Sequence, residues 1–290
     1  MPSDPLLPSV DRIAGAATSD GQGVAPLAAS PLFIVGSPRS GTSILVDAAF
    51  AAGFNGFREG NLLGLLWPLY ERIDDYFRRF DHGNDKTLIS HARRDIIRMA
   101  VREIFRKELD ELNVKKPWLD KTGNAETILI IPDLIEMWPN CRVIFAHRRA
   151  IENMLSRLRK FPGLTFDDHC RAWTRSMCAW RKARDRLPSW RFREVDQRDL
   201  VVRPEIVSQA MVTLLGLGET ASNRIVHTFR RLRPQETEPG TAERVTPLAD
   251  TRWTQAQIDT FMTICGPEME AFGYSLDGTY WQDVEATRRP

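Results

Sequence analysis

The chain has 290 residues, of which 42% are apolar and 27% charged, as is ordinary for a soluble globular protein with a sizeable core. Its formal net charge is only +2, so the overall charge gives no reason to expect a nucleic-acid partner. The longest apolar run, residues 61–70, is too short to cross a bilayer, and no membrane span is expected.

The cysteines and the N-terminal composition bear on the compartment. The four cysteines have no C-x-x-C spacing and no histidine cluster beside them, which argues against a zinc site or a disulfide framework. Residues 1–30 are rich in Pro, Ala, Ser and Gly and lack the charged and apolar regions of a signal peptide. The sequence therefore predicts a flexible tail over residues 1–30 and a cytoplasmic protein.

Strands and helices are predicted to alternate along the rest of the chain. A buried strand over residues 31–37 is followed by an apolar helix over 43–54. Residues 61–80 are aromatic and receive no assignment. Apolar residues at three- and four-residue spacing predict a long amphipathic helix over 88–112, and a short strand follows at 116–123.

The second half of the chain continues the alternation. Residues 127–139 are predicted to be a helix, with Pro132 near its first turn. Residues 141–149 are a second buried strand, and 190–195 a further strand. The remaining predicted helices cover residues 150–161, 168–187, about 204–215 and 254–272.

This order predicts an α/β fold with a parallel sheet covered by helices on both faces. No internal repeat or central linker interrupts the chain, so a single domain is expected over residues 31–290. Ligands of such sheets bind beyond the carboxyl ends of the strands. The residues that directly follow each strand are therefore the candidate functional residues.

The first strand runs into the loop GSPRSGTS, residues 36–43, which resembles a phosphate-binding P-loop without its lysine. The glycines Gly36 and Gly41 have the P-loop spacing, but Thr42 stands where lysine is expected. A basic residue occurs three places earlier, as Arg39. The question is which anion such a loop binds.

Several groups of this loop suit an anion. The helix that begins near Thr42 adds the positive end of its dipole, and Arg39 adds a guanidinium group. The hydroxyls of Ser40, Thr42 and Ser43 can donate hydrogen bonds. A tight strand-to-helix turn with an incidental arginine is the alternative interpretation.

A nucleoside triphosphatase also needs an acidic residue at the end of a second strand to hold Mg²⁺. The strand over 141–149 ends instead in His147-Arg148-Arg149. Between residues 141 and 193, 14 Lys and Arg residues stand against four acidic ones, which suits a polyanion or a solvated face. The strand end predicts a nucleotide with two separated anionic groups, bound without a metal.

These motifs resemble those of the 3′-phosphoadenosine-5′-phosphosulfate (PAPS)-dependent sulfotransferases, in particular their bacterial branch. In that family a loop similar to GSPRSGTS cradles the 5′-phosphosulfate, and an arginine at a strand end, followed eight residues later by serine, holds the 3′-phosphate. Arg148 and Ser156 have this spacing. Residues 193–217 and 252–275 also resemble family segments, so the likeness covers about 31–275.

The resemblance implies a sulfotransferase fold and PAPS as co-substrate, without a metal. It also implies which residues contact the nucleotide: Ser37, Pro38, Arg39, Ser40, Gly41, Thr42, Ser43, Arg148 and Ser156.

The resemblance also implies residues for the chemistry. Sulfuryl transfer needs positioning and charge stabilisation, and Arg39 is the candidate to stabilise the bridging oxygen, although lysine is more usual there. Lys121, in LDKTGN, resembles the basic residue of a Glu-Lys-Thr/Ser motif in carbohydrate-type members and is assigned to the sulfuryl group. Asp120, which replaces the glutamate, is expected to be the ion-pair partner of Lys121.

The general base is a further question. Members that act on phenols and steroids use a histidine after Lys-Thr/Ser, but this chain has Gly123-Asn124 there. Carbohydrate-type members place a glutamate about twenty residues after the basic residue of the loop. Glu59, twenty residues after Arg39, is therefore the predicted base, and His147 is the alternative.

The predicted function is sulfuryl transfer from PAPS to a hydroxyl of a sugar or small metabolite. Variable loops at about 54–90 and 157–170 are expected to select this acceptor, and the oligomeric state stays open. An atypical P-loop kinase or NTPase is one alternative. It would need an acidic residue to hold Mg²⁺, and Glu59 and Asp120 are the only candidates. A non-catalytic nucleotide-binding protein is the other. No nucleic-acid-binding module is recognised.

Overall fold

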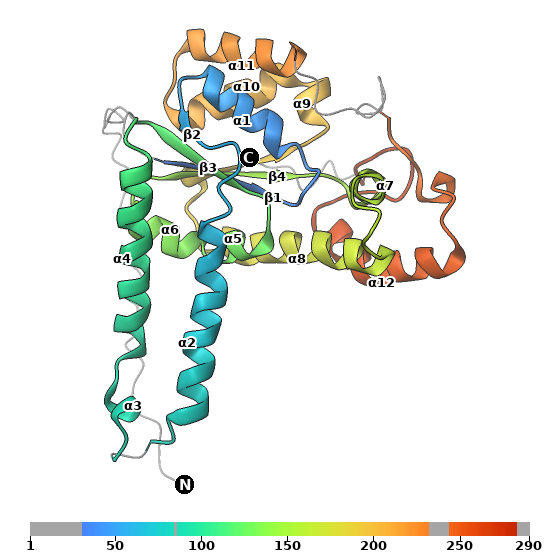
Figure 1. Ribbon diagram of the computed structural model, residues 1–290. Coiled ribbons are helices and arrows are strands. Elements are labelled where there is room, and N and C mark those ends of the chain that lie inside the picture. Colours follow the sequence, from blue (N-terminus) through green and yellow to red (C-terminus); the bar gives the residue numbers. More distant parts are fainter. Residues whose placement is uncertain (1–30, 84–85, 232–243, 283–290) are drawn as a thin grey trace, which may run out of the picture.

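The computed structural model describes residues 31–83, 86–231 and 244–282, so the tail predicted over 1–30 lies outside the described residues. The centre of the fold is a parallel sheet with the strand order β2-β3-β1-β4-β5 (Figure 1). The strands are β1 Leu32–Gly36, β2 Asn55–Gly56, β3 Trp118–Thr122, β4 Arg142–His147 and β5 Phe192–Asp196.

The register of the sheet brings the strand ends together. Val35 near the end of β1 lies opposite Thr122 on β3 and Phe145 on β4. All five residues of β1 are buried, which agrees with its continuous apolar sequence and its place between two neighbours. Because the strands are parallel, the loops that follow β1, β3, β4 and β5 meet at one edge of the sheet.

Helices cover both faces of the sheet, as the alternation of elements predicts (Figure 1). Helices α1, α10 and α11 lie on one face, and α5, α6 and α8 on the other. Short 3₁₀ turns occur at Leu63–Leu65, Ser189–Arg191 and Leu248–Asp250. The helices are α1 Thr42–Ala51, α2 Leu66–Phe80, α3 Leu88–His91, α4 Arg94–Leu112, α5 Ala125–Leu129, α6 Ile131–Met137, α7 Ala150–Lys160, α8 Phe166–Arg184, α9 Asp199–Val202, α10 Pro204–Leu215, α11 Glu219–Arg231 and α12 Gln255–Ala271.

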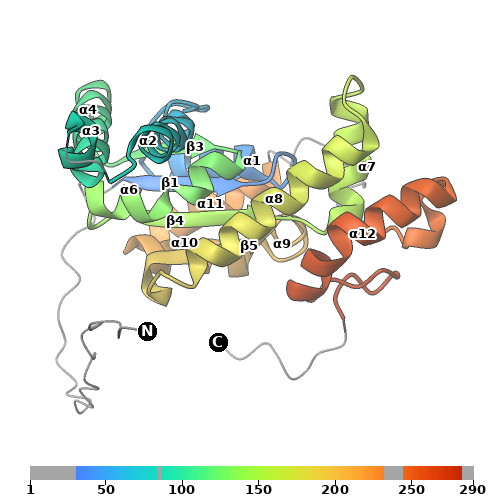
Figure 2. The same cartoon turned by 90° about the horizontal axis from the view of Figure 1, so that it is seen from below.

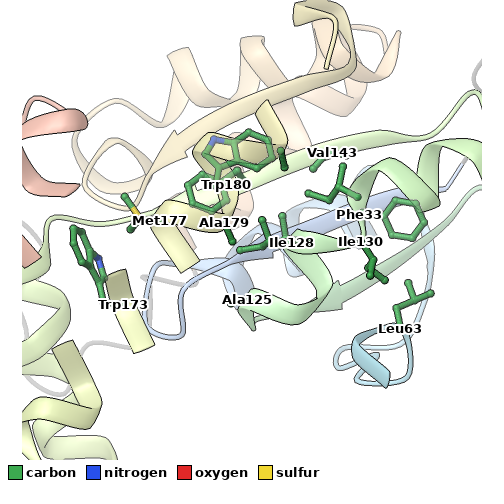
Figure 3. Close-up of a cluster of buried hydrophobic side chains, with 14 of the residues drawn as sticks. Phe33, Leu63, Ala125, Ile128, Ile130, Val143, Trp173, Met177, Ala179 and Trp180 are labelled. Atoms are coloured by element: carbon green, nitrogen blue, oxygen red, sulfur yellow. The ribbon is translucent and has the colours of Figure 1, made fainter. Parts of the chain in front are cut away.

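Each face of the sheet has its own hydrophobic core. Phe33, Trp173 and Trp180 belong to the core under α5 and α8 (Figure 3). The Trp180 ring stacks on Phe145 with ring centroids 4.5 Å apart. Burial of one such side chain stabilises the fold by roughly 1.5–3 kcal/mol. The tryptophans of α8 are therefore core residues and not ligand contacts.

A pair of helices projects from the body of the molecule. Helices α2 and α4 run side by side away from the sheet, and Figure 2 shows them almost end-on beside it. The guanidinium of Arg98 lies over the Tyr70 ring, 4.2 Å from its centroid, and joins the two helices. The unassigned segment 61–80 thus forms a 3₁₀ turn and α2. Within the described ranges, no helix is long and apolar enough to cross a membrane.

Two helical predictions differ from the structure, and α9 and α11 received no prediction. The helix predicted over 127–139 is two helices, α5 and α6, divided at Ile130, with Pro132 in the first turn of α6 as expected. The helix predicted over 88–112 is interrupted before Arg94, where Ala92 is extended. Helix α11 was not predicted, although Ile225 and Phe229 have helical spacing and are buried.

Candidate active site

The loop after β1 has an unusual backbone that fits an anion site. A Cβ atom on Gly36 would lie 2.1 Å from the carbonyl oxygen of Ala146, so only glycine lets β1 approach β4 here. Arg39 and Gly41 both have positive φ, at 72° and 87°, which for arginine is a strained conformation. Helix α1 then begins at Thr42 without a side-chain cap. Its first N–H groups have no partner within the helix and can bind an anion.

Helix α7 fixes this loop through a residue that the sequence analysis missed. Asn153 donates from Nδ2 to the carbonyl oxygen of Pro38 at 3.0 Å and to Ser40 Oγ at 3.2 Å. Ser37 and Ser40 are fully buried. Asn153 therefore ties the loop to the helix that follows β4.

The predicted nucleotide motifs meet at Arg39. Its Nε donates to Ser156 Oγ at 2.9 Å, which links the first motif to the second. Partial burial lowers the pKa of Arg39, and repulsion from the Arg148 and Arg159 guanidinium groups lowers it further. Arg39 and Arg148, which follow strand ends, and Arg159, in the last turn of α7, are therefore close enough to repel one another, and an anion among them would be stabilised.

The two arginines after β4 have different roles. Arg149 is fully buried and forms an ion pair with Glu152. It also donates to the carbonyl oxygens of Thr246 at 2.8 Å and Asp277 at 2.7 Å. Arg149 thus holds the C-terminal segment in place. Arg148 Nε, in contrast, is buried and has no hydrogen-bond partner among the described residues, and burial lowers the pKa of this side chain.

At the end of β3, Lys121 meets Glu59 from the loop after β2. The Lys121 ammonium group forms an ion pair with Glu59 Oε1. The Lys121 side chain is only 8% exposed, whereas that of Glu59 is 55% exposed. The structure thus brings together two residues that the sequence singled out separately.

The expected ion pair between Asp120 and Lys121 is wrong. Successive side chains of a strand point to opposite faces of the sheet, so the side chains of Asp120 and Lys121 point away from each other. Instead, the Asp120 carboxylate accepts a hydrogen bond from Thr122 Oγ1 at 3.0 Å. Burial raises the pKa of Asp120 to about 6, and the negative charge of Glu59 contributes.

His147, the alternative base, belongs to a buried hydrogen-bond network. Its Nδ1 is bonded to the Tyr274 hydroxyl, which donates to Asp196 Oδ2 at 2.6 Å. The Tyr280 hydroxyl donates to Asp196 Oδ1 at 2.9 Å. No sequence pattern indicates this network, because its tyrosines lie far along the chain from β4 and β5. The network packs the C-terminal segment onto the strand ends, which is a structural role for His147.

A metal centre would draw on the cysteine, histidine and acidic side chains of the described part of the chain. Within residues 31–83, 86–231 and 244–282, no three His, Cys, Asp or Glu side chains are grouped so that they could hold a metal ion. Cys141, Cys170, Cys178 and Cys265 are free thiols, and all but Cys178 are buried.

Comparison with known proteins identifies the family. Residues 31–221 match the model of the sulfotransferase family. No curated protein matches the sequence. Sulfotransferase STF9 from Mycobacterium avium has a similar structure, with a TM-score of 0.53, 15% identity, and coverage of 88% of this chain and 79% of that chain.

Two further solved structures are more distant. The sulfotransferase domain of the Synechococcus PCC 7002 olefin synthase has a TM-score of 0.48 and 17% identity, and the match covers 86% of this chain and 96% of that domain. Mouse sulfotransferase SULT7A1, complexed with PAP, has a TM-score of 0.48 and 13% identity, with coverage of 83% and 85%. From the family match and the parallel sheet with helices on both faces, the chain belongs to the sulfotransferase family and has the sulfotransferase fold.

Proposed function

We propose that this protein transfers a sulfuryl group from PAPS to a hydroxyl of a sugar or small metabolite. The observation that carries the proposal is the convergence of the loop after β1 with Arg148, through the contact between Arg39 and Ser156. This convergence supports a ligand with two anionic groups, one at the loop after β1 and one at Arg148 and Ser156. Membership of the sulfotransferase family supports the same ligand class.

The residues present fit the donor nucleotide. The first N–H groups of α1 and the hydroxyls of Thr42 and Ser43 would hold the 5′-phosphosulfate. Arg148 and Ser156 would hold the 3′-phosphate, and the buried Nε of Arg148 without a partner among the described residues supports this role. When bound, PAPS supplies the sulfuryl group, whose bond to the bridging phosphate oxygen breaks as the bond to the acceptor oxygen forms.

Three side chains would assist the transfer. The Glu59 carboxylate accepts the proton of the acceptor hydroxyl, a role that typically contributes 10²–10⁴-fold to the rate. Lys121 orients Glu59 through their ion pair and stabilises negative charge on the sulfuryl oxygens. Arg39 stabilises the charge that develops on the bridging oxygen. Since arginine keeps its proton, it does so as a fixed cation and not as an acid.

The acceptor is proposed from the same residues. The pairing of Glu59 with Lys121 corresponds to the carbohydrate-type pattern, which favours a sugar or similar small hydroxyl compound. The loop that carries Glu59 leads through the 3₁₀ turn Leu63–Leu65 into α2, and all three belong to the predicted acceptor segment 54–90. We therefore assign acceptor selection to this part of the chain.

Calorimetric titration with adenosine 3′,5′-bisphosphate in the presence of EDTA tests the nucleotide site. We expect micromolar binding without metal, weakened at least tenfold in Arg148→Ala, because a hydrogen bond to a charged group is worth about 1.5–3 kcal/mol. Arg171→Ala, at an exposed ion pair with Asp167, is the matched control and should bind like the wild type.

This titration, together with an assay of sulfuryl transfer, separates the alternative functions. Binding of Mg·ATP but not of the bisphosphate would indicate that the protein is a P-loop kinase or NTPase. Tight binding of PAPS without turnover of any hydroxyl acceptor would indicate a non-catalytic nucleotide-binding protein.

A further inference from the structure

The loop that carries Glu59 is attached to the end of β3 by its own backbone. The N–H group of Gly60 donates to the carbonyl oxygen of Lys121 at 2.9 Å. The N–H group of Asn61 donates to the side-chain oxygen of Thr122 at 3.0 Å. The two residues that directly follow Glu59 are therefore both bonded to β3, and one bond depends on a side chain.

Asp120 determines how the Thr122 hydroxyl is oriented. A hydroxyl has one proton, and that of Thr122 is donated to Asp120 Oδ1 at 3.0 Å. An ionised carboxylate only accepts hydrogen bonds, so it requires the proton to point toward it. The lone pairs of the Thr122 oxygen then face the Asn61 N–H group. Asp120, Thr122 and Asn61 thus form a directional chain of hydrogen bonds.

The loop backbone also packs directly on the Asp120 carboxylate. A Cβ atom on Gly60 would lie 1.7 Å from Asp120 Oδ2, so no larger residue fits while this carboxylate stays in place. Asp120 itself is buried. Neither Asp120 nor Thr122 has a part in the proposed transfer, yet both contact the residues that follow the base.

We infer that Asp120 and Thr122 are positioning residues that hold the Glu59 loop against the end of β3 and so set the place of the carboxylate. The importance of this for activity rests on the proposed function of Glu59. The loop contacts themselves do not depend on that function, and they can be measured without nucleotide or acceptor.

Ionisation of Asp120 should control the chain of hydrogen bonds. The charged groups that act on Asp120 are Glu59, which raises its pKa, and Lys121, which lowers it; burial dominates, and the pKa is about 6. Above pH 6 the carboxylate is ionised and orients Thr122. Below pH 6 the carboxyl group has a proton of its own, which can compete with the Asn61 N–H group for the Thr122 oxygen. The loop is then held less firmly.

Hydrogen exchange of the unliganded protein, followed by mass spectrometry of peptides over residues 57–63, tests the contact. In Thr122→Val we expect exchange in this segment to be at least tenfold faster than in the wild type at pH 7.5. Thr122→Ser retains the hydroxyl and should retain most of the protection. Thr228→Val is the matched control, since Thr228 is also a buried threonine, bonded to the Arg224 carbonyl oxygen on α11. Unchanged exchange in Thr122→Val would overturn the inference.

A double-mutant cycle tests the packing of Gly60 on Asp120. Gly60→Ala alone should accelerate exchange in the loop, because its methyl group displaces the carboxylate or the loop. In an Asp120→Ala background, which removes the carboxylate, the same change should have a clearly smaller effect. Additive effects would show that Gly60 and Asp120 are not in contact.

Turnover separates positioning from a general loss of structure. In Thr122→Val we expect kcat to fall tenfold or more while the dissociation constant of adenosine 3′,5′-bisphosphate stays within twofold of the wild type. Equal loss of both would assign Thr122 a structural role. If the bisphosphate does not bind even to the wild type, the proposed function fails, whereas the exchange result still decides the loop contact.

Discussion

Arg39 donates a hydrogen bond from Nε to Ser156 Oγ at 2.9 Å, and this bond joins the loop after β1 to helix α7 after β4. The two residues are 117 positions apart in the chain, and each belongs to a different predicted anion-binding motif. The sheet register makes the bond possible, because Gly36 at the end of β1 lies beside Ala146 near the end of β4. The Ser156 hydroxyl therefore contacts Arg39 of the first motif and is itself part of the second.

Ser156→Ala should weaken binding of adenosine 3′,5′-bisphosphate about tenfold or more. The change removes a hydroxyl that would bond the 3′-phosphate, and it removes the acceptor that holds Arg39 in place. Ser176→Ala is the matched control, because Ser176 is a buried helical serine whose hydroxyl donates within its own helix, to the Ala172 carbonyl oxygen. Calorimetry on both variants measures the effect. Equal affinity in Ser156→Ala and the control would count against the proposed 3′-phosphate site.

Glu59→Gln should lower kcat by about 10²–10⁴-fold without weakening the bisphosphate complex, because the amide cannot accept the acceptor proton. Glu59 is the ion-pair partner of the nearly buried Lys121, and glutamine keeps an oxygen that can accept from this ammonium group, so the free energy of unfolding should fall by only about 1 kcal/mol. Steady-state kinetics with PAPS and a panel of hydroxyl acceptors measures kcat. Glu71→Gln, an exposed glutamate on α2, is the control. If Glu59→Gln retains full turnover, another group is the base.

Much of the fold follows from the sequence, because buried parallel strands have continuous apolar runs and end in recognisable loops. This pattern predicted the strands at 31–37 and 141–149. It also predicted the loop that joins each of them to the helix that follows. Helix α11 was missed because most of its residues are polar, and only the spacing of Ile225 and Phe229 indicates its buried face. The candidate site residues were singled out from the sequence where they follow strand ends, because a strand end can be recognised from the apolar run before it.

Other parts of the site depend on contacts that no local pattern encodes. The sequence singled out Arg148 by its spacing from Ser156 but assigned no role to Arg149, whose partners include the carbonyl oxygens of Thr246 and Asp277, far along the chain. It also paired Lys121 with its neighbour Asp120. The alternation of side chains along a strand excludes that pair, but the actual partner, Glu59, comes from a loop whose path requires the tertiary structure.

Tyr280→Phe should destabilise the protein by about 1–3 kcal/mol, because it removes a hydrogen bond from a buried carboxylate. Asp196 accepts from the Tyr280 and Tyr274 hydroxyls, and burial raises the pKa of Asp196 above its usual range. In a chain of this size, 1 kcal/mol corresponds to about 2–4 °C in Tm. Thermal unfolding of Tyr280→Phe beside Tyr76→Phe, whose ring is exposed, measures the difference. A Tm equal to that of the control would show that the network does not support the fold.

Asp120→Asn should make the protein more stable at neutral pH and less active at the same time. The pKa of Asp120 is raised from 3.8 to about 6, so between these values the folded protein binds the proton more tightly than the unfolded chain. The contribution of this group to stability therefore falls as pH rises from about 4 to 6 and is constant above that. A pKa difference of about two units corresponds to about 3 kcal/mol of folding stability, which the wild type loses on going to neutral pH. The amide introduced by Asp120→Asn does not titrate, so this variant does not lose this stability.

Urea unfolding of the wild type and Asp120→Asn at pH 4.5 and pH 7.5 measures the contribution of Asp120 ionisation to the free energy of unfolding, because all other titrating groups are common to both proteins. We expect the stability difference to shift in favour of Asp120→Asn at the higher pH. Activity should fall because the amide can donate to the Thr122 oxygen and compete with the Asn61 N–H group, so that the loop is no longer held by an acceptor-only partner. A stability difference that is the same at both pH values would show that Asp120 titrates normally, and the orientation of Thr122 would then need another cause.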